Sequence, residues 1–253
     1  MLQYQGFSVD IVIPTCNRGN LLSRAIHSAL EQKDLVSRVF LVDNGSVPVC
    51  LEPGHDQRIK LIRTAPNIGA SAARNAGVIA SDSKIIAFLD DDDYWQPGFI
   101  AAALPLFDKG ADIVVGRLMR KAEDGSLKEY KLLGSTVGAQ RELYFRNPGF
   151  GGQNILVKRS LYEKLGGFDV DMPASNDRDF AVRALQAGAK IMVQPESVAV
   201  LCDHSGERVR HKQVLGNYCF IKKHWKHMAW VERYRACKTL AKRYAYLKLK
   251  GHG

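Results

Sequence analysis

The sequence predicts an α/β fold in which a mostly parallel β-sheet is flanked by helices. Short apolar runs rich in β-branched residues alternate with segments whose apolar residues recur at helical spacing, which is the pattern of successive βαβ units. The chain has 253 residues, of which 46% are hydrophobic. That size and composition suit one large α/β domain, or one domain with a smaller appendage.

The first part of the chain alternates regularly between the two patterns. "VDIVIP" opens it as a short β-branched run typical of a buried parallel strand. Strands are expected over residues 9–14, 38–46, 58–64 and 84–90. Helices are expected over residues 19–32, 68–81 and 98–107.

The second part is less regular. The following elements are expected in chain order: a strand over 111–119, a hairpin over 121–130 turning at Asp124–Gly125, a flexible loop over 149–154, a strand and short helix over 155–168 stopped by Gly166–Gly167, a helix over 177–188, and short strands over 189–194 and 197–201. Residues 212–250 have a helical pattern that is both basic and aromatic.

The net charge of +10 is concentrated in the C-terminal tail, which predicts an anionic partner for that segment. Residues 205–253 hold 13 Lys/Arg and 2 Asp/Glu, whereas residues 1–204 hold 23 and 24. Basic helices with interleaved aromatic residues suit an anionic lipid surface, but the same composition also suits a helix packed on the domain. A mixture is favoured, with Tyr218, Phe220 and Ile221 packing and the later lysines and arginines near membrane or phosphate.

Several other classes of protein are disfavoured. The five cysteines contain no C-x-x-C, so neither a zinc site nor a disulfide framework is indicated. Neither G-x-x-x-x-G-K-[ST] nor G-x-G-x-x-G occurs, so a P-loop or dinucleotide fingerprint is not supported. No signal peptide and no apolar run of about 18 residues is found, which together predict a cytoplasmic protein.

Three predicted strands end in polar residues, and ligands of open α/β sheets bind beyond the carboxyl ends of strands. These ends are Pro14–Arg18, Asp43–Ser46 and the run Asp90–Asp93. Two carboxylates ~4 Å apart repel by ~4 kcal/mol at an effective dielectric near 20, and a divalent cation removes that repulsion. The run therefore predicts a metal site, with Asp93 expected to cap the helix that begins near Pro97.

Five motifs occur together in a characteristic order: "VDIVIPTCNR", "LVDNGS", "NIGASAARNAG", "IIAFLDDDDYWQP" and "GGFDVDMPASNDRDFAVRALQAG". Over about Val9 to Cys202 the chain resembles the family 2 glycosyltransferases, inverting nucleotide-sugar enzymes with the GT-A fold. The resemblance implies a Rossmann-like catalytic domain over residues 1–204, with a nucleotide half at about 1–118 and an acceptor half at about 119–204. A basic lid and helical tail would follow over 205–253.

The resemblance also implies roles for individual residues. Asp43 corresponds to the aspartate that binds a uracil-type base, whose N3–H a carboxylate can accept. Asp90 and Asp91 would contact ribose or donor sugar, and Asp92, the last position of the D-x-D motif, would bind Mn²⁺ or Mg²⁺. The remaining expected nucleotide or donor contacts are Pro14, Thr15, Asn17, Arg18, Asn67 and Arg74.

The acceptor half contributes the expected catalytic base, Asp177, at a position where the family carries a carboxylate before a helix. Asn176 stands where Glu is usual, and Asp177 could also serve as the helix N-cap. Expected acceptor contacts are Gly152, Gln153, Trp95 and Asp179, although Trp95 suits packing better. His204 is expected near metal or diphosphate, and Arg208 and Arg210 as a lid over phosphates.

The function implied is transfer of a sugar from a nucleotide diphosphate sugar, with UDP favoured, to a hydroxyl of a glycan or lipid-linked acceptor. Bacterial surface polysaccharide or lipopolysaccharide synthesis on the inner face of the plasma membrane is the expected setting. Two alternatives stay open. A metal-dependent nucleotidyltransferase shares aspartates at a sheet edge, and a nucleic-acid-binding protein would use the basic tail but leaves the aspartate run unexplained.

Overall fold

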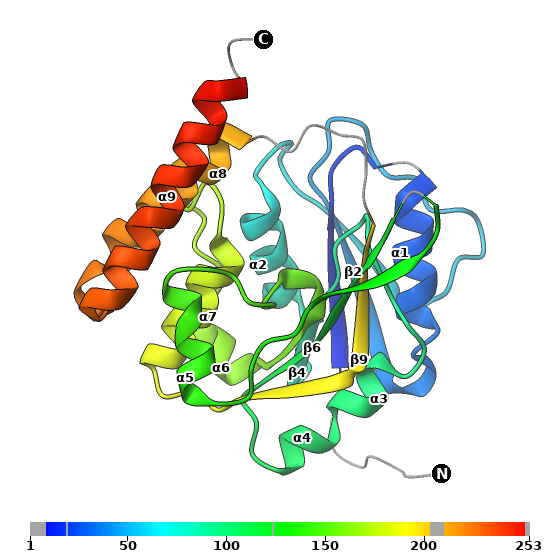
Figure 1. The fold of residues 1–253 in the computed structure, drawn as a ribbon. Coiled ribbons are helices and arrows are strands. Elements are labelled where there is room, and N and C mark those ends of the chain that lie inside the picture. Colours follow the sequence, from blue (N-terminus) through cyan, green and yellow to red (C-terminus); the bar gives the residue numbers. More distant parts are fainter. Residues whose placement is uncertain (1–8, 19, 123, 203–209, 251–253) are drawn as a thin grey trace.

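The structure is a computed structural model that describes residues 9–18, 20–122, 124–202 and 210–250. It confirms the α/β prediction: nine strands of the described chain form one curved sheet flanked by helices (Figure 1). The sheet order is β3-β2-β1-β4-β8-β6-β9-β5, and β7 pairs with β6. Six strands share one direction, while β5, β7 and β8 run against it.

The strands are β1 (Val9–Thr15), β2 (Val36–Asp43), β3 (Ile59–Arg63), β4 (Ile85–Phe88), β5 (Tyr94–Trp95), β6 (Ile113–Lys121), β7 (Leu127–Lys131), β8 (Ile155–Lys158) and β9 (Ile191–Cys202). The α-helices are α1 (Asn20–Leu30), α2 (Ala70–Ala80), α3 (Phe99–Ala103), α4 (Pro105–Asp108), α5 (Val137–Gln140), α6 (Arg159–Lys164), α7 (Asn176–Gln186), α8 (Arg210–His224) and α9 (Trp230–Lys250). Short 3₁₀ turns occupy Lys33–Leu35, Arg141–Tyr144, Gly152–Asn154 and Trp225–His227.

The predicted elements of the first part are confirmed, with one division. The single helix expected over 98–107 is split into α3 and α4 at Leu104, because Pro105 has no N–H to donate and begins a new helix. The hairpin is also confirmed, since β6 and β7 pair in antiparallel fashion and Gly125 adopts a positive φ of 82° at the turn.

The last two predicted strands are instead one strand, β9, of 12 residues. Its pairing with β6 shifts register between Gly116, opposite Gln194, and Arg117, opposite Val198. The bulge accommodates Pro195, which cannot donate to the ladder. Gly116 is needed there, because a Cβ at this position would lie 2.4 Å from the carbonyl oxygen of Ser197.

The segment 149–154, expected to be a flexible loop, is a buried turn instead. The amide of Asn154 donates to the carbonyl oxygens of Gly116 and Gly149 at 2.6 and 2.9 Å. Its side-chain oxygen accepts from the Gly151 N–H at 2.8 Å. Asparagine thus supplies the hydrogen bonds that this irregular backbone cannot make to itself, and the turn becomes a fixed wall beside the sheet.

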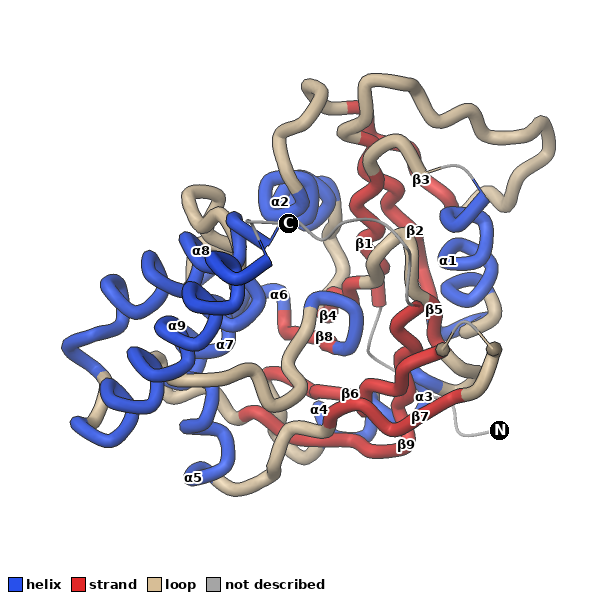
Figure 2. Tube along the Cα trace, turned by 45° about the horizontal axis from the view of Figure 1, so that its top comes forward, coloured by secondary structure: helices blue, strands red, loops and turns tan. Residues whose placement is uncertain are grey.

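Apolar side chains fill both faces of the sheet. One cluster lies under α1, α3 and α4, and the other under α2, α6 and α7 (Figure 2). The tail is part of the second cluster, since Phe220, Ile221, Met228 and Ala236 are buried in it. Tyr218 is exposed, so the prediction that it packs is wrong. The basic tail is therefore a helical hairpin of α8 and α9 built onto the domain.

Among the helices of the described residues, none is both long and apolar enough to span a bilayer.

Candidate active site

The parallel course of β1, β2 and β4 places three polar strand ends at one edge of the sheet. Thr15 is paired with Asp43 across β1 and β2, and Asp90 follows β4 beside them. Of these strand ends, the one at Asp90 lines a cavity of about 460 Å³. Its lining comes from α2, the β4 end, β6–β7, the turn at 147–153, α7 and the tail: Arg74, Asp90, Leu118, Tyr130, Lys131, Asn147, Phe150, Gly151, Gly152, Gln153, Ala174, Ser175, Asn176, Asp177, Arg178, Leu201, Gln213 and Arg243.

Asp177 faces this cavity from the first turn of α7. Its Oδ1 accepts the Arg178 N–H at 2.7 Å, and its Oδ2 accepts the side-chain amide of Asn147 at 3.2 Å. Ser175, with a φ of 63°, is the N-cap, so the alternative that Asp177 also caps the helix does not hold. Burial raises the pKa of Asp177, although the Arg178 N–H and the charges of Arg74 and Arg178 oppose the increase.

The buried Arg74 and the half-buried Asp90 form an ion pair that also lines the cavity. Arg74 also lies over the ring of Phe168, 5.3 Å from its centroid. A Cβ at Gly152 would lie 2.8 Å from the Arg74 guanidinium, so glycine is required for this close approach. The expected nucleotide residue Arg74 and the expected acceptor residue Gly152 therefore share one wall.

The four aspartates separate into different environments. Asp91 lies 3.4 Å from the Cys16 N–H, and Arg18 approaches Asp91 and Asp92 at 3.8 and 3.4 Å. Burial and the neighbouring charges of Asp92 and Asp90 raise the pKa of Asp91 to about 6.

Asp93 does not cap a helix as predicted. Its Oδ1 accepts the Cys202 N–H of β9 at 3.0 Å, while Gly98 is the N-cap of α3. Burial, with the charges of Asp90 and Asp92, raises the pKa of Asp93 to about 8. This side chain joins the aspartate run to the end of β9 and is absent from the cavity lining.

The donor set around Asp91 and Asp92 suits a hard cation. No group of three or more His, Cys, Asp or Glu residues positioned for a metal occurs in the described part of the chain. Mg²⁺ and similar ions are commonly held by one or two carboxylates plus substrate phosphates, and two converging carboxylates match that arrangement. His204 and Arg208 lie outside the described residues, and Arg210 begins α8 without a described side chain.

The expected nucleotide residues Asn17 and Asp43 hold the loop after β2. The Asn17 oxygen accepts the Val47 N–H at 3.0 Å. The buried Asp43 carboxylate accepts the N–H groups of Gly45 and Val49 at 2.9 and 2.7 Å and pairs with Arg63. A carboxylate has about four acceptor positions, so these three contacts leave one unused on a side chain that is fully buried.

The other expected nucleotide residues lie at the same edge. Pro14 and Thr15 end β1 as buried residues, and the Thr15 carbonyl oxygen accepts both the N–H and the side-chain amide of Asn44. Asn67, with a φ of 62°, donates its N–H to the Asn44 carbonyl oxygen at 2.7 Å. A second cavity of about 650 Å³ lies between α1 and residues 47–55, and Asn17 and Arg18 form part of its lining.

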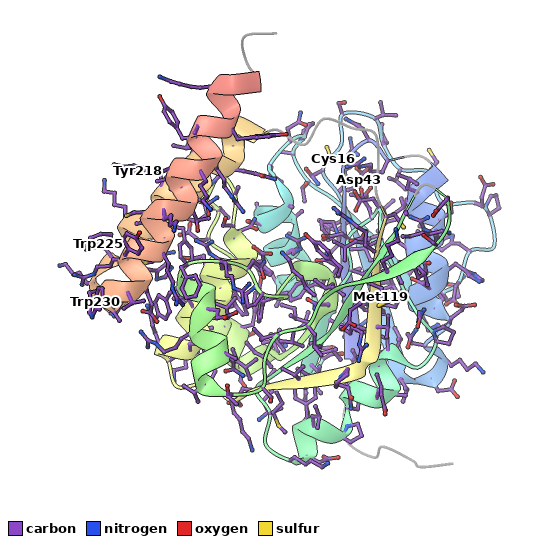
Figure 3. All side chains as sticks on the ribbon, viewed as in Figure 1. Cys16, Asp43, Met119, Tyr218, Trp225 and Trp230 are labelled. Atoms are coloured by element: carbon purple, nitrogen blue, oxygen red, sulfur yellow. The ribbon has the colours of Figure 1, made fainter. Side chains whose placement is uncertain are left out.

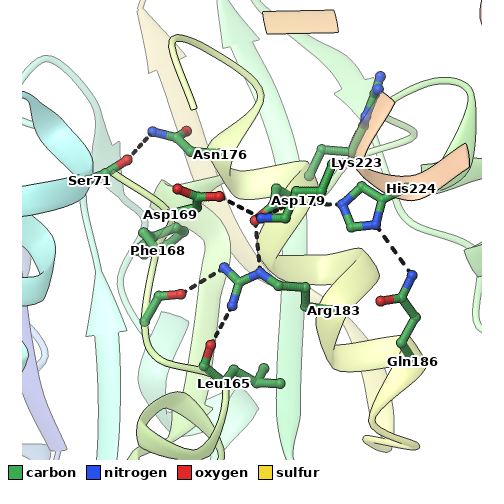
Figure 4. Close-up of polar contacts among 12 residues, drawn as sticks. Ser71, Leu165, Phe168, Asp169, Asn176, Asp179, Arg183, Gln186, Lys223 and His224 are labelled. Atoms are coloured by element: carbon green, nitrogen blue, oxygen red, sulfur yellow. Dashed lines mark hydrogen bonds and ion pairs between the residues drawn. The ribbon is translucent and has the colours of Figure 1, made fainter. Parts of the chain in front are cut away.

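Two of the expected acceptor residues are part of the core, as the sequence favoured for Trp95 but not for Asp179. Trp95 stacks on Phe99 with ring centroids 4.4 Å apart, and its Nε1 donates to the Gln153 carbonyl oxygen at 2.7 Å. Trp95 therefore fixes the turn that carries Gln153, which does line the cavity. Asp179 is fully buried against α8 and is absent from the cavity lining (Figure 4).

The cavity also contains residues that the sequence did not single out. Asn147, Arg178 and Arg243 line it from three separate elements. Arg178 lies within the quoted "NDRD" motif, but no periodicity distinguishes its side chain from a surface arginine. Arg243 is one of many tail cations, and only the tertiary packing of α9 brings it to the site.

Comparison with known proteins supports the predicted family. The family model described as "Glycosyl transferase family 2" matches residues 10–166. The crystal structure of S. aureus TarS 1–349 is similar in fold, with a TM-score of 0.59 and 17% sequence identity over 94% of this chain and 70% of that one. This likeness confirms the predicted fold class.

Curated relatives include proteins of polysaccharide synthesis. Succinoglycan biosynthesis protein ExoO of Rhizobium meliloti is 29% identical over 75% of this chain and 59% of its own length. Pre-mycofactocin glycosyltransferase of Mycobacterium tuberculosis is 30% identical over 78% and 43%. The putative colanic acid biosynthesis glycosyl transferase WcaA of Escherichia coli is 26% identical over 85% and 81%. The chain thus spans about half of the length of the first two relatives. Because the family model covers more than half of the chain, this protein belongs to glycosyl transferase family 2.

Proposed function

We propose that this protein transfers a sugar from a nucleotide diphosphate sugar to an acceptor hydroxyl, with inversion at the anomeric carbon. The observation that supports this proposal most directly is the cavity that Asp177 shares with the Arg74–Asp90 pair, beside the carboxylates of Asp91 and Asp92. A base and a donor-binding edge on one cavity are what a single displacement requires.

In the proposed reaction Asp177 accepts the proton of the acceptor hydroxyl as that oxygen attacks the anomeric carbon. The bond from the anomeric carbon to the diphosphate breaks, and the nucleoside diphosphate leaves with the electron pair. Asn147 orients the Asp177 carboxylate by its hydrogen bond to Oδ2. Asp92, with Asp91, would hold Mn²⁺ or Mg²⁺, whose charge favours departure of the diphosphate.

The proposed donor is UDP-linked, because Asp43 retains an acceptor position for a base N–H at the end of β2. The proposed acceptor is a glycan or a lipid-linked saccharide of a bacterial surface polysaccharide. The names of the relatives from succinoglycan and colanic acid synthesis support that class.

The test is a screen of UDP-, GDP- and dTDP-sugars with glycan acceptors and Mn²⁺ or Mg²⁺, in which released nucleotides are separated by chromatography. Release of nucleoside diphosphate, abolished by EDTA and restored by the metal, is the expected result. Release of pyrophosphate would instead identify a nucleotidyltransferase. Full activity in EDTA-treated protein would contradict the proposed metal requirement.

We also propose that the tail hairpin contacts an anionic membrane surface from the cytoplasmic side. Tyr218 on α8, Trp225 in the 3₁₀ turn after it and Trp230 on α9 project from the outer side of the hairpin (Figure 3). Trp230 is 78% exposed, and Tyr234 beside it is also exposed. Exposed aromatic side chains among lysines and arginines match the interface of anionic lipid bilayers.

Replacing Trp230 and Tyr234 with serine is expected to weaken binding to phosphatidylglycerol vesicles roughly tenfold, because interfacial apolar area is lost. Vesicle flotation measures this binding, and phosphatidylcholine vesicles serve as the comparison without net charge. Ile79→Ser, which removes an exposed apolar side chain from α2, is the matched control. Equal binding by the tail variant and this control would overturn the proposal.

Point variants are preferable to deleting the tail. Glu232 accepts two hydrogen bonds from Arg141 at 2.8 and 2.7 Å, and Ala236 is buried in the apolar cluster under α2, α6 and α7. A chain ending near residue 229 would lose these contacts, so it would report on folding as well as on membrane binding.

A further inference from the structure

Arg178 is a buried cation whose charge is not neutralised by an ion pair within the described chain. Arg178 is only 4% exposed, although it lines the cavity. Its guanidinium lies 3.6 Å from the centroid of the Phe220 ring, and Nη1 donates to the Asn217 side chain at 3.2 Å. Its Nε–H is buried without a hydrogen-bond partner among the described residues. Such a donor is costly unless a ligand satisfies it.

The two neighbouring carboxylates are already engaged elsewhere. Asp177 accepts the Arg178 backbone N–H and the amide of Asn147. Asp179 accepts from Arg183, Lys223 and His224. The sequence "NDRD" therefore places Arg178 between two acids, but the fold directs both acids to other partners.

Arg243 brings a second positive charge to the same cavity from α9. Burial, together with the charge of Arg243, lowers the pKa of Arg178 to about 10, although Asp177 opposes the decrease. Lys131 and Gln213 complete this side of the lining. Two arginines on one cavity repel each other in the free protein, and an oxyanion between them removes the repulsion and accepts their N–H groups.

This basic side of the cavity differs from the donor edge. Arg18, Asp91 and Asp92 meet beyond the end of β4 and are absent from the cavity lining. Arg178 follows Asp177 in α7, and Arg243 belongs to the tail. A group held by these two arginines would therefore contact α7 and α9 rather than α2 and the end of β4, which carry the expected donor residues Arg74 and Asp90.

We propose that Arg178 and Arg243 form a binding site for an oxyanion, a phosphate ester or a carboxylate, carried by the acceptor. The identification of this ligand as the acceptor rests on the proposed function. Anion binding at the site can be measured without any sugar transfer. It predicts an acceptor class, namely phosphorylated, lipid diphosphate-linked or acidic saccharides rather than neutral ones. It also gives α9 a role in the site in addition to packing.

The test titrates glycerol 1-phosphate, glucuronate and neutral glycerol into the full chain at constant ionic strength, with binding followed by NMR. The phosphate ester or glucuronate is expected to bind and glycerol is not. Which of the two anions binds more tightly identifies the oxyanion. Arg243→Gln is expected to weaken binding about tenfold to 100-fold, since hydrogen bonds to a charged group are lost. Lys242→Gln removes the same charge one residue away and is expected to bind like the unmodified protein.

The donor is measured in parallel, because its diphosphate is the competing anion. UDP affinity is expected to stay within about twofold in Arg243→Gln and in Arg178→Lys, which keeps the buried charge. If UDP binding falls together with anion binding, the arginines hold donor phosphate and the proposal is wrong. It is also wrong if neither anion binds, or if Arg243→Gln and Lys242→Gln behave alike. Anion binding without transfer to any acceptor would contradict only the proposed function.

Discussion

Replacing Asp177 with asparagine is expected to lower kcat by about 10²–10⁴-fold, the usual contribution of a general base. Asparagine keeps the size of the side chain, and its oxygen can still accept the Arg178 N–H. The variant loses the ability to take the acceptor proton and, at the position of Oδ2, the hydrogen bond from the Asn147 amide. Nucleoside diphosphate affinity should therefore stay nearly unchanged, as measured by calorimetry, while steady-state release of the diphosphate falls.

Asp171→Asn is the matched control, because Asp171 is an exposed carboxylate on the loop before the same helix. This control is expected to retain full activity. If Asp177→Asn retained the activity of the control, another group would have to be the base. A parallel loss of nucleotide affinity would instead indicate a binding role for Asp177.

The acidic limb of the pH profile provides a second readout of the same residue. Burial raises the pKa of Asp177, so the carboxylate is protonated at a higher pH than an ordinary aspartate. A base must be deprotonated, so kcat/KM should fall as the pH decreases through this raised pKa. This acidic decrease of kcat/KM should be absent in the Asp177→Asn variant. The charged groups that share its cavity are Arg74 on α2, Asp90 after β4, Lys131 on β7, Arg178 on α7 and Arg243 on α9.

The sequence predicted the edge of the sheet where the polar residues meet, because this depends on local strand patterns and parallel pairing. The ends of β1, β2 and β4 lie together as expected. The partner of each polar side chain was harder to predict, since partners come from distant segments. Asp93 bonds to Cys202, 109 residues away, and a local pattern suggested a helix cap instead.

The same limit applies to the core of the acceptor half. Trp95 follows the aspartate run, and packing was favoured over a sugar contact; it does stack on Phe99, and it also supports Gln153 from a distant segment. Arg178 was missed because its lack of an ion pair depends on where Asp177 and Asp179 point. Periodicity places these residues on a helix, but only packing decides which charges are satisfied.

Asp179→Asn is expected to destabilise the protein by about 3 kcal/mol, because this one carboxylate compensates the charges of Arg183 and Lys223 and also binds the buried His224. Asp179 is 0% exposed and accepts from Arg183, Lys223 and His224, each at 2.8 Å (Figure 4). These bonds join α7 to α8, so their loss should loosen the tail hairpin as well. The free energy of unfolding in urea measures the effect.

Asp169→Asn separates this effect from the loss of any one contact to the tail. Asp169 binds the same Lys223 at 2.5 Å but is partly exposed, so its replacement should cost within about 1 kcal/mol.

The partners of Asp179 hold its pKa well below the ordinary value, despite its burial. Its stabilisation is therefore fully present above the unfolded pKa of about 3.9 and is lost as the pH falls through the lower folded value. The difference between the unmodified protein and Asp179→Asn should accordingly be constant above about pH 5 and shrink under more acidic conditions. Equal stabilities for the two variants at neutral pH would show that Asp179 does not join the tail to the domain.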